Sequence, residues 1–133
     1  MGRTFKESAR NNIGIMEISG SIIESYDYCR EAEIRESLIR MDIAARDGLI
    51  VDVRQLHSER DAVENFVVLL FKAVKNMRFP EMDFFKITTS VCIVAADGNF
   101  RQRFILSNMN KIFRITDSIE EALSLIRGEQ QTK

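Results

Sequence analysis

The run Leu49-Ile50-Val51-Asp52-Val53, near the middle of the chain, limits the possible folds more than any other feature. Its aliphatic residues, most of them β-branched, favour a β-strand. Because odd and even positions alike are apolar, both faces of such a strand must be buried. This pattern is typical of an inner strand of a parallel sheet with helices on each side. The sequence therefore predicts an α/β fold in which this strand is central.

Four segments have apolar residues at the three-and-four spacing of an amphipathic helix. Asp27 or Ser25 can cap the first, and Asp47-Gly48 is expected to end it. The last is expected to begin at Ser118, with a capping box completed by Glu121, and to end at Gly128. The apolar positions are Ile34, Leu38, Met41 and Ala45; Val63, Phe66, Leu70, Ala73 and Met77, in a helix from about Ala62 to Arg78; Ile105, Met109 and Ile112; and Ile119, Ala122, Leu123 and Ile126.

Further strands are expected between these helices, from their β-branched residues and flanking turn signals. Strands joined through helices imply parallel pairing with right-handed crossovers, while an opening hairpin makes the sheet mixed. The predicted fold is thus a mixed, mostly parallel β-sheet flanked by four helices. The expected strands are Ile13–Ile18, stopped by Ser19-Gly20; a partner at Thr4–Glu7, turned by Asn11-Asn12; a short piece at Ser21–Ile23; Ile87–Ala95; and a brief edge strand at Phe113–Ile115.

Bulk composition is that of an ordinary globular protein. The 133 residues are expected to form a single domain over 1–133, with a core at about 13–127 and loose ends at 1–3 and 128–133. A formal net charge of −1 gives no bulk electrostatic attraction to nucleic acid or to an anionic membrane. No apolar run approaches the roughly 20 residues of a membrane helix, and we find no secretory signal, so we expect a cytoplasmic protein.

Few residues are suited to catalysis or metal binding. The only histidine, His57, stands beside Ser58 and Glu59 with no glycine-rich nucleophile turn, which favours a solvated loop. Cys29 and Cys92 lack metal-ligand spacing and are expected to be reduced, buried thiols. We therefore expect no enzymatic activity, no metal and no cofactor.

Several of these segments together resemble the STAS family, the sulfate transporter and anti-sigma-factor antagonist domains. The most specific likeness is the C-terminal run from Phe113 to Leu123, in which a short strand leads to a helix opening with Ser-Ile-Glu-Glu-Ala. A strand ending in Ile18-Ser19-Gly20, and the buried strand with Asp52 just before its end, also match. The likeness extends from about Ile13 to Ile126.

The chain departs from the family at one site. Anti-sigma-factor antagonists carry an Asp-Ser-Ser-Gly-like motif after the third strand, and a partner kinase phosphorylates its serine. Here the stretch reads Gln55 to Val63 with neither a serine pair nor a glycine, and the phosphoacceptor position falls near Asp61. Asp61 is expected either to cap the following helix or to supply a fixed negative charge in place of phosphoserine. Ser58 is the only hydroxyl left in this loop.

The resemblance implies a regulatory domain that binds another protein: an anti-sigma factor, a kinase-like regulator, or a second copy of itself as a homodimer. The expected contact surface is the loop after the third strand and the exposed face of the second helix, near Asp52, Ser58, Asp61, Glu64 and Asn65, with apolar area from Val67 and Val68. Asp52 has two readings that stay open here: a site residue at a strand end, or a carboxylate that accepts backbone N–H bonds.

The alternative function is sensing of a small molecule or nucleotide. The turn from Asp97 to Arg103 leads from a strand into a helix, and helix N-termini bind phosphates. Asn99, Arg101 and Arg103 are the candidate anion-binding residues, although a single glycine falls far short of a phosphate-binding loop. A solvated helix start is the other reading of this turn.

Overall fold

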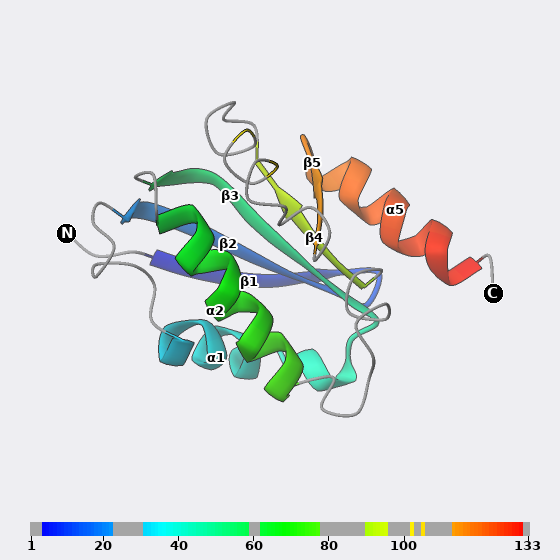
Figure 1. Cartoon of the computed structure of the whole chain (residues 1–133). Helices are drawn as coiled ribbons and strands as arrows, with labels where there is room; N and C mark the ends of the chain where they lie inside the picture. Colours follow the sequence, from blue (N-terminus) through cyan, green and yellow to red (C-terminus); the bar gives the residue numbers. More distant parts are fainter. Residues whose placement is uncertain are drawn as a thin grey trace.

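The computed structural model describes residues 4–22, 31–58, 62–77, 90–95, 102, 105 and 113–131. Within these residues the chain forms one five-stranded sheet, three α-helices and a short 3-10 helix (Figure 1). The strands are β1 (Thr4–Arg10), β2 (Ile13–Ile22), β3 (Gly48–Ser58), β4 (Val91–Val94) and β5 (Arg114–Thr116); the helices are α1 (Glu31–Arg40), α2 (Ala62–Met77) and α5 (Ile119–Gln131), with the 3-10 helix η1 at Ile43–Ala45.

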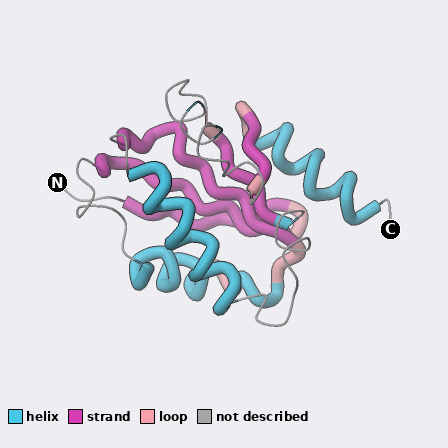
Figure 2. The backbone as a smooth tube through the Cα atoms, viewed as in Figure 1, coloured by secondary structure: helices cyan, strands magenta, loops and turns pink. Residues whose placement is uncertain are grey.

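The sheet is mixed and its strands lie in sequence order, β1-β2-β3-β4-β5. The β1/β2 pair is antiparallel, and the β2/β3, β3/β4 and β4/β5 pairs are parallel. Figure 2 shows these strands as one twisted layer. The prediction that the strand through Leu49–Val53 is central is confirmed, because β3 has two strands on each side.

Helices cover both faces of the sheet. Helices α1 and α2 pack against each other over one face (Figure 1), where Leu49, Val51 and Val53 of β3 are buried with Leu38 and Leu70. Helix α5 covers part of the opposite face through a second cluster, whose members are Ile13, Ile15, Ile50, Cys92, Val94, Ile119, Ala122, Leu123 and Ile126. Alternate side chains of β3 therefore enter the cores on opposite faces of the sheet, as expected for a strand that is apolar at odd and even positions.

The opening hairpin turns at Asn11 and Asn12, both with positive φ (54° and 63°), as a two-residue type I′ turn requires. The predicted stop at Ser19-Gly20 is wrong, because β2 continues through both residues to Ile22 as a single strand. Gly20 permits this with a φ of 118°, which a residue with a side chain rarely adopts.

The first helix is shorter than predicted. Helix α1 ends at Arg40, and Asp42 then takes a left-handed conformation (φ 55°) before η1. Ile34, Leu38 and Met41 are buried as expected, but Ala45 is exposed and does not continue their stripe. The chain changes direction at Asp42, so residues after it no longer lie on the apolar face of α1.

Other boundaries also differ from the predictions. Strand β1 continues to Arg10 instead of ending at Glu7. Gln55 to Ser58, predicted as loop, belong to β3, so His57 lies in a strand. Strand β4 begins only at Val91, after Ser90 in a helical conformation. Gly128 does not end α5, which continues to Gln131.

The helix expected around Met109 and Ile112 lies outside the described residues, and Ile105, its one described apolar position, is 49% exposed instead of buried. The second predicted helix agrees with α2, and the buried side predicted for the last helix is confirmed in α5.

Candidate functional site

The predicted contact surface lies where β3 leads into α2. Asp52 belongs to the inner part of β3, Ser58 is the last residue of this strand, and α2 begins at Ala62. Positions 64 and 65 fall in the first turn of α2. Asp61 lies outside the described residues, and so do Asn99, Arg101 and Arg103, so that the anion-site hypothesis stays a prediction.

A β-bulge separates Asp52 from the end of its strand. Glu17 of β2 pairs with Asp52, but Ser19 pairs with Gln55, so β3 has one residue more than β2 over this stretch. A bulge leaves the extra residue out of the ladder and frees a backbone N–H that needs another acceptor.

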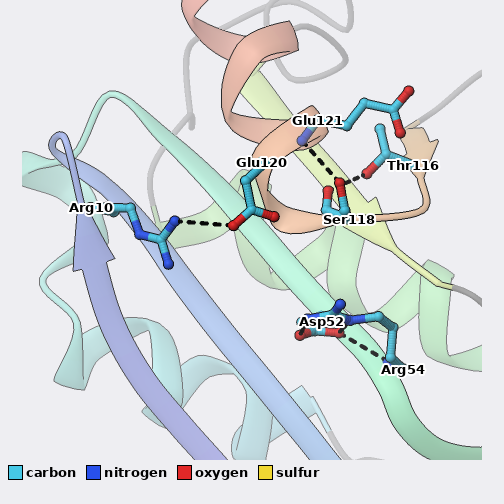
Figure 3. A network of polar contacts seen from close by, with 7 residues as sticks. All are labelled: Arg10, Asp52, Arg54, Thr116, Ser118, Glu120 and Glu121. Atoms are coloured by element: carbon cyan, nitrogen blue, oxygen red, sulfur yellow. Dashed lines mark hydrogen bonds and ion pairs between the residues drawn. The ribbon is translucent and has the colours of Figure 1, made fainter.

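The carboxylate of Asp52 supplies that acceptor. Asp52 Oδ1 accepts hydrogen bonds from the backbone N–H of Arg54 (3.0 Å) and from Arg54 Nε (3.0 Å), and Oδ2 accepts one from Nη2 (2.8 Å). Figure 3 shows the two side chains together on β3. Only 7% of the Asp52 side chain is exposed, against 37% for Arg54. Of the two readings left open for Asp52, the geometry therefore favours the structural one, with the N–H donated from within the strand.

The contact with Asp52 also changes the pKa of the Arg54 guanidinium. Its hydrogen bonds to Asp52 raise the pKa of Arg54, and the charges of Asp52, Glu120 and Glu17 add to the effect, while desolvation opposes it. An Arg–carboxylate fork of this kind fixes geometry as well as charge. The role of Arg54 was missed by sequence reasoning, although opposite charges two residues apart on a strand lie on the same face.

Asp52 also borders a small cavity of mixed polar and apolar lining on the face that α5 covers only in part. Lys6, Glu17 and Asp52 stand in register across β1, β2 and β3. The cavity has a volume of about 190 Å³ and is lined by Thr4, Lys6, Glu17, Ile18, Ser19, Asp52 and Gln55. Within the described part of the chain, no group of three or more His, Cys, Asp or Glu side chains is placed to hold a metal ion.

Among the side chains of α2 that the structure describes, residues 68–75, the exposed side has one apolar residue followed by two basic ones. Val68 is 40% exposed, and Lys72 and Lys75 are exposed at the helical spacing that places them on the same side. Positions 64 and 65 precede Val68 by four and three residues, so helical periodicity puts them on this side too. We call the positions 64, 65, 68, 72 and 75 the α2 stripe.

The start of α5 has the predicted cap with one difference. Ser118 Oγ accepts the backbone N–H of Glu121 (3.1 Å), while Glu121 Oε1 accepts the N–H of Asp117 (3.3 Å) instead of that of Ser118. Thr116 donates its hydroxyl to the Ser118 carbonyl (3.1 Å), which joins the end of β5 to this cap (Figure 3).

A second polar cluster joins β1 to α1. Glu7 of β1 accepts hydrogen bonds from Ser37 (2.7 Å) and from Arg40 (2.8 and 3.1 Å), a cluster that sequence reasoning did not find. The hydrogen bond from Arg40 is the main reason that the pKa of Glu7 lies below its usual value. Cys92 is buried as expected, and desolvation raises the pKa of its thiol. Cys29 lies outside the described residues.

Among the described helices, none is long and apolar enough to cross a membrane. No model of a protein family matches the sequence, and no curated protein matches it either.

Solved structures do match the chain, over nearly its whole length. A crystal structure of an anti-sigma factor antagonist from Mycobacterium paratuberculosis superposes with a TM-score of 0.67 at 12% identity, covering 95% of each chain. The anti-sigma factor antagonist SpoIIAA in its unphosphorylated form gives 0.57 at 14% identity, covering 94% of this chain and 97% of the other. The NMR structure of the protein TM1081 gives 0.62 at 12% identity, covering 93% and 89%. The chain therefore has the STAS fold of anti-sigma-factor antagonists.

Proposed function

We propose that this protein is a non-enzymatic regulatory domain that binds another protein, in the manner of an anti-sigma-factor antagonist, without the serine phosphorylation switch of that family. The observation that carries the proposal is the full-length agreement with anti-sigma-factor antagonists, which extends over 95% of both chains in the first comparison. Two proteins with the same fold can differ in function, so the geometry of the site must also fit the proposed activity.

The corner between β3 and α2 is suited to contact with a macromolecule. The bulge held by Asp52 and Arg54 fixes the last part of β3 before the chain enters α2. At the helix start, unpaired N–H groups and the positive end of the helix dipole favour negative charge. In the sequence Asp61 directly precedes the first residue of α2, and its carboxylate is a permanent charge where a phosphorylatable serine would supply a switchable one.

The α2 stripe provides the neighbouring contact area. Val68 supplies exposed apolar surface, and Lys72 and Lys75 give this end of the helix a positive charge. A partner that covers the stripe would place an apolar residue over Val68 and acidic residues opposite the two lysines. We therefore propose an anti-sigma factor or kinase-like regulator with an acidic rim around an apolar centre.

The experiment is a calorimetric titration with anti-sigma-factor regulators encoded in the same genome. We expect a complex with one of them, and we expect Val68→Asp to weaken it at least tenfold, because it puts a carboxylate into an apolar contact. Lys72→Glu should also weaken it. Glu36→Lys, a charge reversal at an exposed position of α1, is the matched control and should leave the affinity unchanged. A complex that is insensitive to the α2 variants would contradict the proposed surface.

A further inference from the structure

The two edge strands of the sheet differ in length, and the longer one could pair with a strand of another chain. Strand β5 forms one edge with three residues, while β1 forms the other with seven. The pairing of β1 with β2 runs from Thr4 to Arg10 without a bulge, and β1 contains no proline. Monomeric proteins normally shorten, bend, cover or charge such an edge, and of these devices β1 has, within the part of the chain that the structure describes, only the charges of Lys6, Glu7 and Arg10. Among the described residues, β1 has a strand partner on one side only.

The hairpin decides which backbone groups of β1 point outward. A two-residue turn at Asn11-Asn12 makes its flanking residues, Arg10 and Ile13, a hydrogen-bonded pair. Hydrogen-bonded and non-hydrogen-bonded pairs then alternate along an antiparallel ladder. The residues of β1 whose N–H and C=O groups point away from β2 are consequently Phe5, Glu7 and Ala9.

We propose that β1 pairs antiparallel with β1 of a second copy of this chain, around a twofold axis at Glu7, to make one continuous sheet across a homodimer. In this register Phe5 and Ala9 of one copy lie opposite Ala9 and Phe5 of the other. All three outward-facing residues of each copy then exchange both of their backbone hydrogen bonds. On the other face of the sheet, Lys6 lies opposite Ser8 of the second copy, and Thr4 lies opposite Arg10.

The charges of β1 select this register over its neighbours. An axis at Lys6 would set two lysines directly opposite each other, which is unfavourable. An axis at Ser8 would set Lys6 opposite Arg10 twice, and the 3.7 Å ion pair of Arg10 with Glu120, whose side chain is 78% exposed, compensates that charge only weakly. The axis at Glu7 does bring two carboxylates together. Each of them is already bound by Arg40 at 2.8 Å and by Ser37 at 2.7 Å, so its charge is compensated within its own copy.

A second copy of this chain is the partner that fits β1, because the outward N–H and C=O groups of one β1 match those of another β1 in antiparallel orientation. The pairing uses the full length of β1, and a twofold axis requires the same surface from both copies. It does not involve the corner between β3 and α2, so it is independent of the proposed partner binding.

The first test is the mass in solution, measured by light scattering over a concentration series. We expect a dimer of the 15.3 kDa chain. Ala9→Pro removes an outward N–H that β1 does not use within its own sheet, and proline is tolerated in edge strands. We expect it to raise the dissociation constant about 30-fold or more with the circular dichroism spectrum retained. Ala9→Ser keeps the N–H and should remain dimeric.

The second test fixes the register by cross-linking, in a Cys29→Ser background. Lys6→Cys and Ser8→Cys proteins should form a disulfide-linked heterodimer when mixed and oxidised, since only an axis at Glu7 puts these positions opposite each other within disulfide reach. Either protein alone should stay uncross-linked. A monomer at all concentrations would overturn the proposal, as would a dimer that survives Ala9→Pro or a disulfide in the Lys6→Cys protein alone.

Discussion

The ion pair of Asp52 and Arg54 leads to a quantitative prediction about the bulge. Asp52→Ala removes the acceptor of three hydrogen bonds, and one of the donors is a backbone N–H that the bulge has taken out of the ladder. Leaving the part-buried N–H of Arg54 without a partner costs about 1–2 kcal/mol, and the two side-chain hydrogen bonds are lost as well. The guanidinium can return partly to water, because 37% of the Arg54 side chain is exposed. We therefore expect Asp52→Ala to lower the free energy of unfolding by about 2–3 kcal/mol.

Arg54→Ala should cost less, about 1–2 kcal/mol, because the carboxylate of Asp52 keeps the backbone N–H as a donor. The double variant should be less destabilised than the sum of the single ones, by about 1 kcal/mol, since the partners contact each other directly. Urea unfolding measures these values from the midpoint at a constant slope. Gln55→Ala, at an exposed position beside the bulge, is the control and should change stability by less than about 0.5 kcal/mol.

The opposite result would reassign Asp52. If Asp52→Ala were as stable as the original protein, or more stable, the carboxylate would be held in a costly position for a reason other than folding. A simultaneous loss of partner binding would then identify Asp52 as a contact residue, which is the other reading of its place near a strand end. A destabilised variant that still binds its partner when folded supports the structural role.

Three further predictions concern stability. Gly48→Ala should cost about 2 kcal/mol or more in urea unfolding, because its Cβ would lie 2.8 Å from Ile126 Cγ2 and 3.0 Å from the backbone carbonyl oxygen of Ser90. Gly14→Ala meets the unbranched side chain of Met41, which can shift more easily, and should cost less. Ser118→Ala should lower the free energy of unfolding by about 1 kcal/mol through loss of its cap, and equal stability would refute the cap. The depressed pKa of Glu7 means that its contribution is present above about pH 4.5 and is lost as the pH falls through the folded-state value. Stability measured across that range should therefore fall more steeply for the original protein than for Glu7→Gln, and parallel curves would contradict the pairing with Arg40.

The layered fold could be predicted because it depends on periodic burial. Leu49–Val53 is apolar at odd and even positions, and both clusters of the core take residues from it. The Ser118 cap of α5 was likewise readable, since it acts within one helical turn, although Glu121 accepts the N–H of Asp117 and not that of Ser118. These features depend on the spacing of residues along the chain and on which faces of a strand or helix are apolar, and both can be read from the sequence.

The remaining details depend on contacts that spacing does not encode. The bulge after Asp52 follows from the pairing of β3 with β2, which extends β3 to Ser58 where polarity suggested a loop. Helix α1 ends where Asp42 turns left-handed, although the apolar spacing continues. Gly128 is a weak helix residue but lies within α5, because propensity yields to context.

The most direct test of the central claim is the affinity for the anti-sigma-factor regulator before and after incubation with its kinase and ATP, with intact mass as the readout of modification. The absence of a phosphorylatable motif predicts one unchanged dissociation constant, an unmodified Ser58 and no added phosphate. Phosphate on Ser58 accompanied by release of the partner would show that the domain retains the switch. No measurable complex with any such regulator would contradict the proposed function itself.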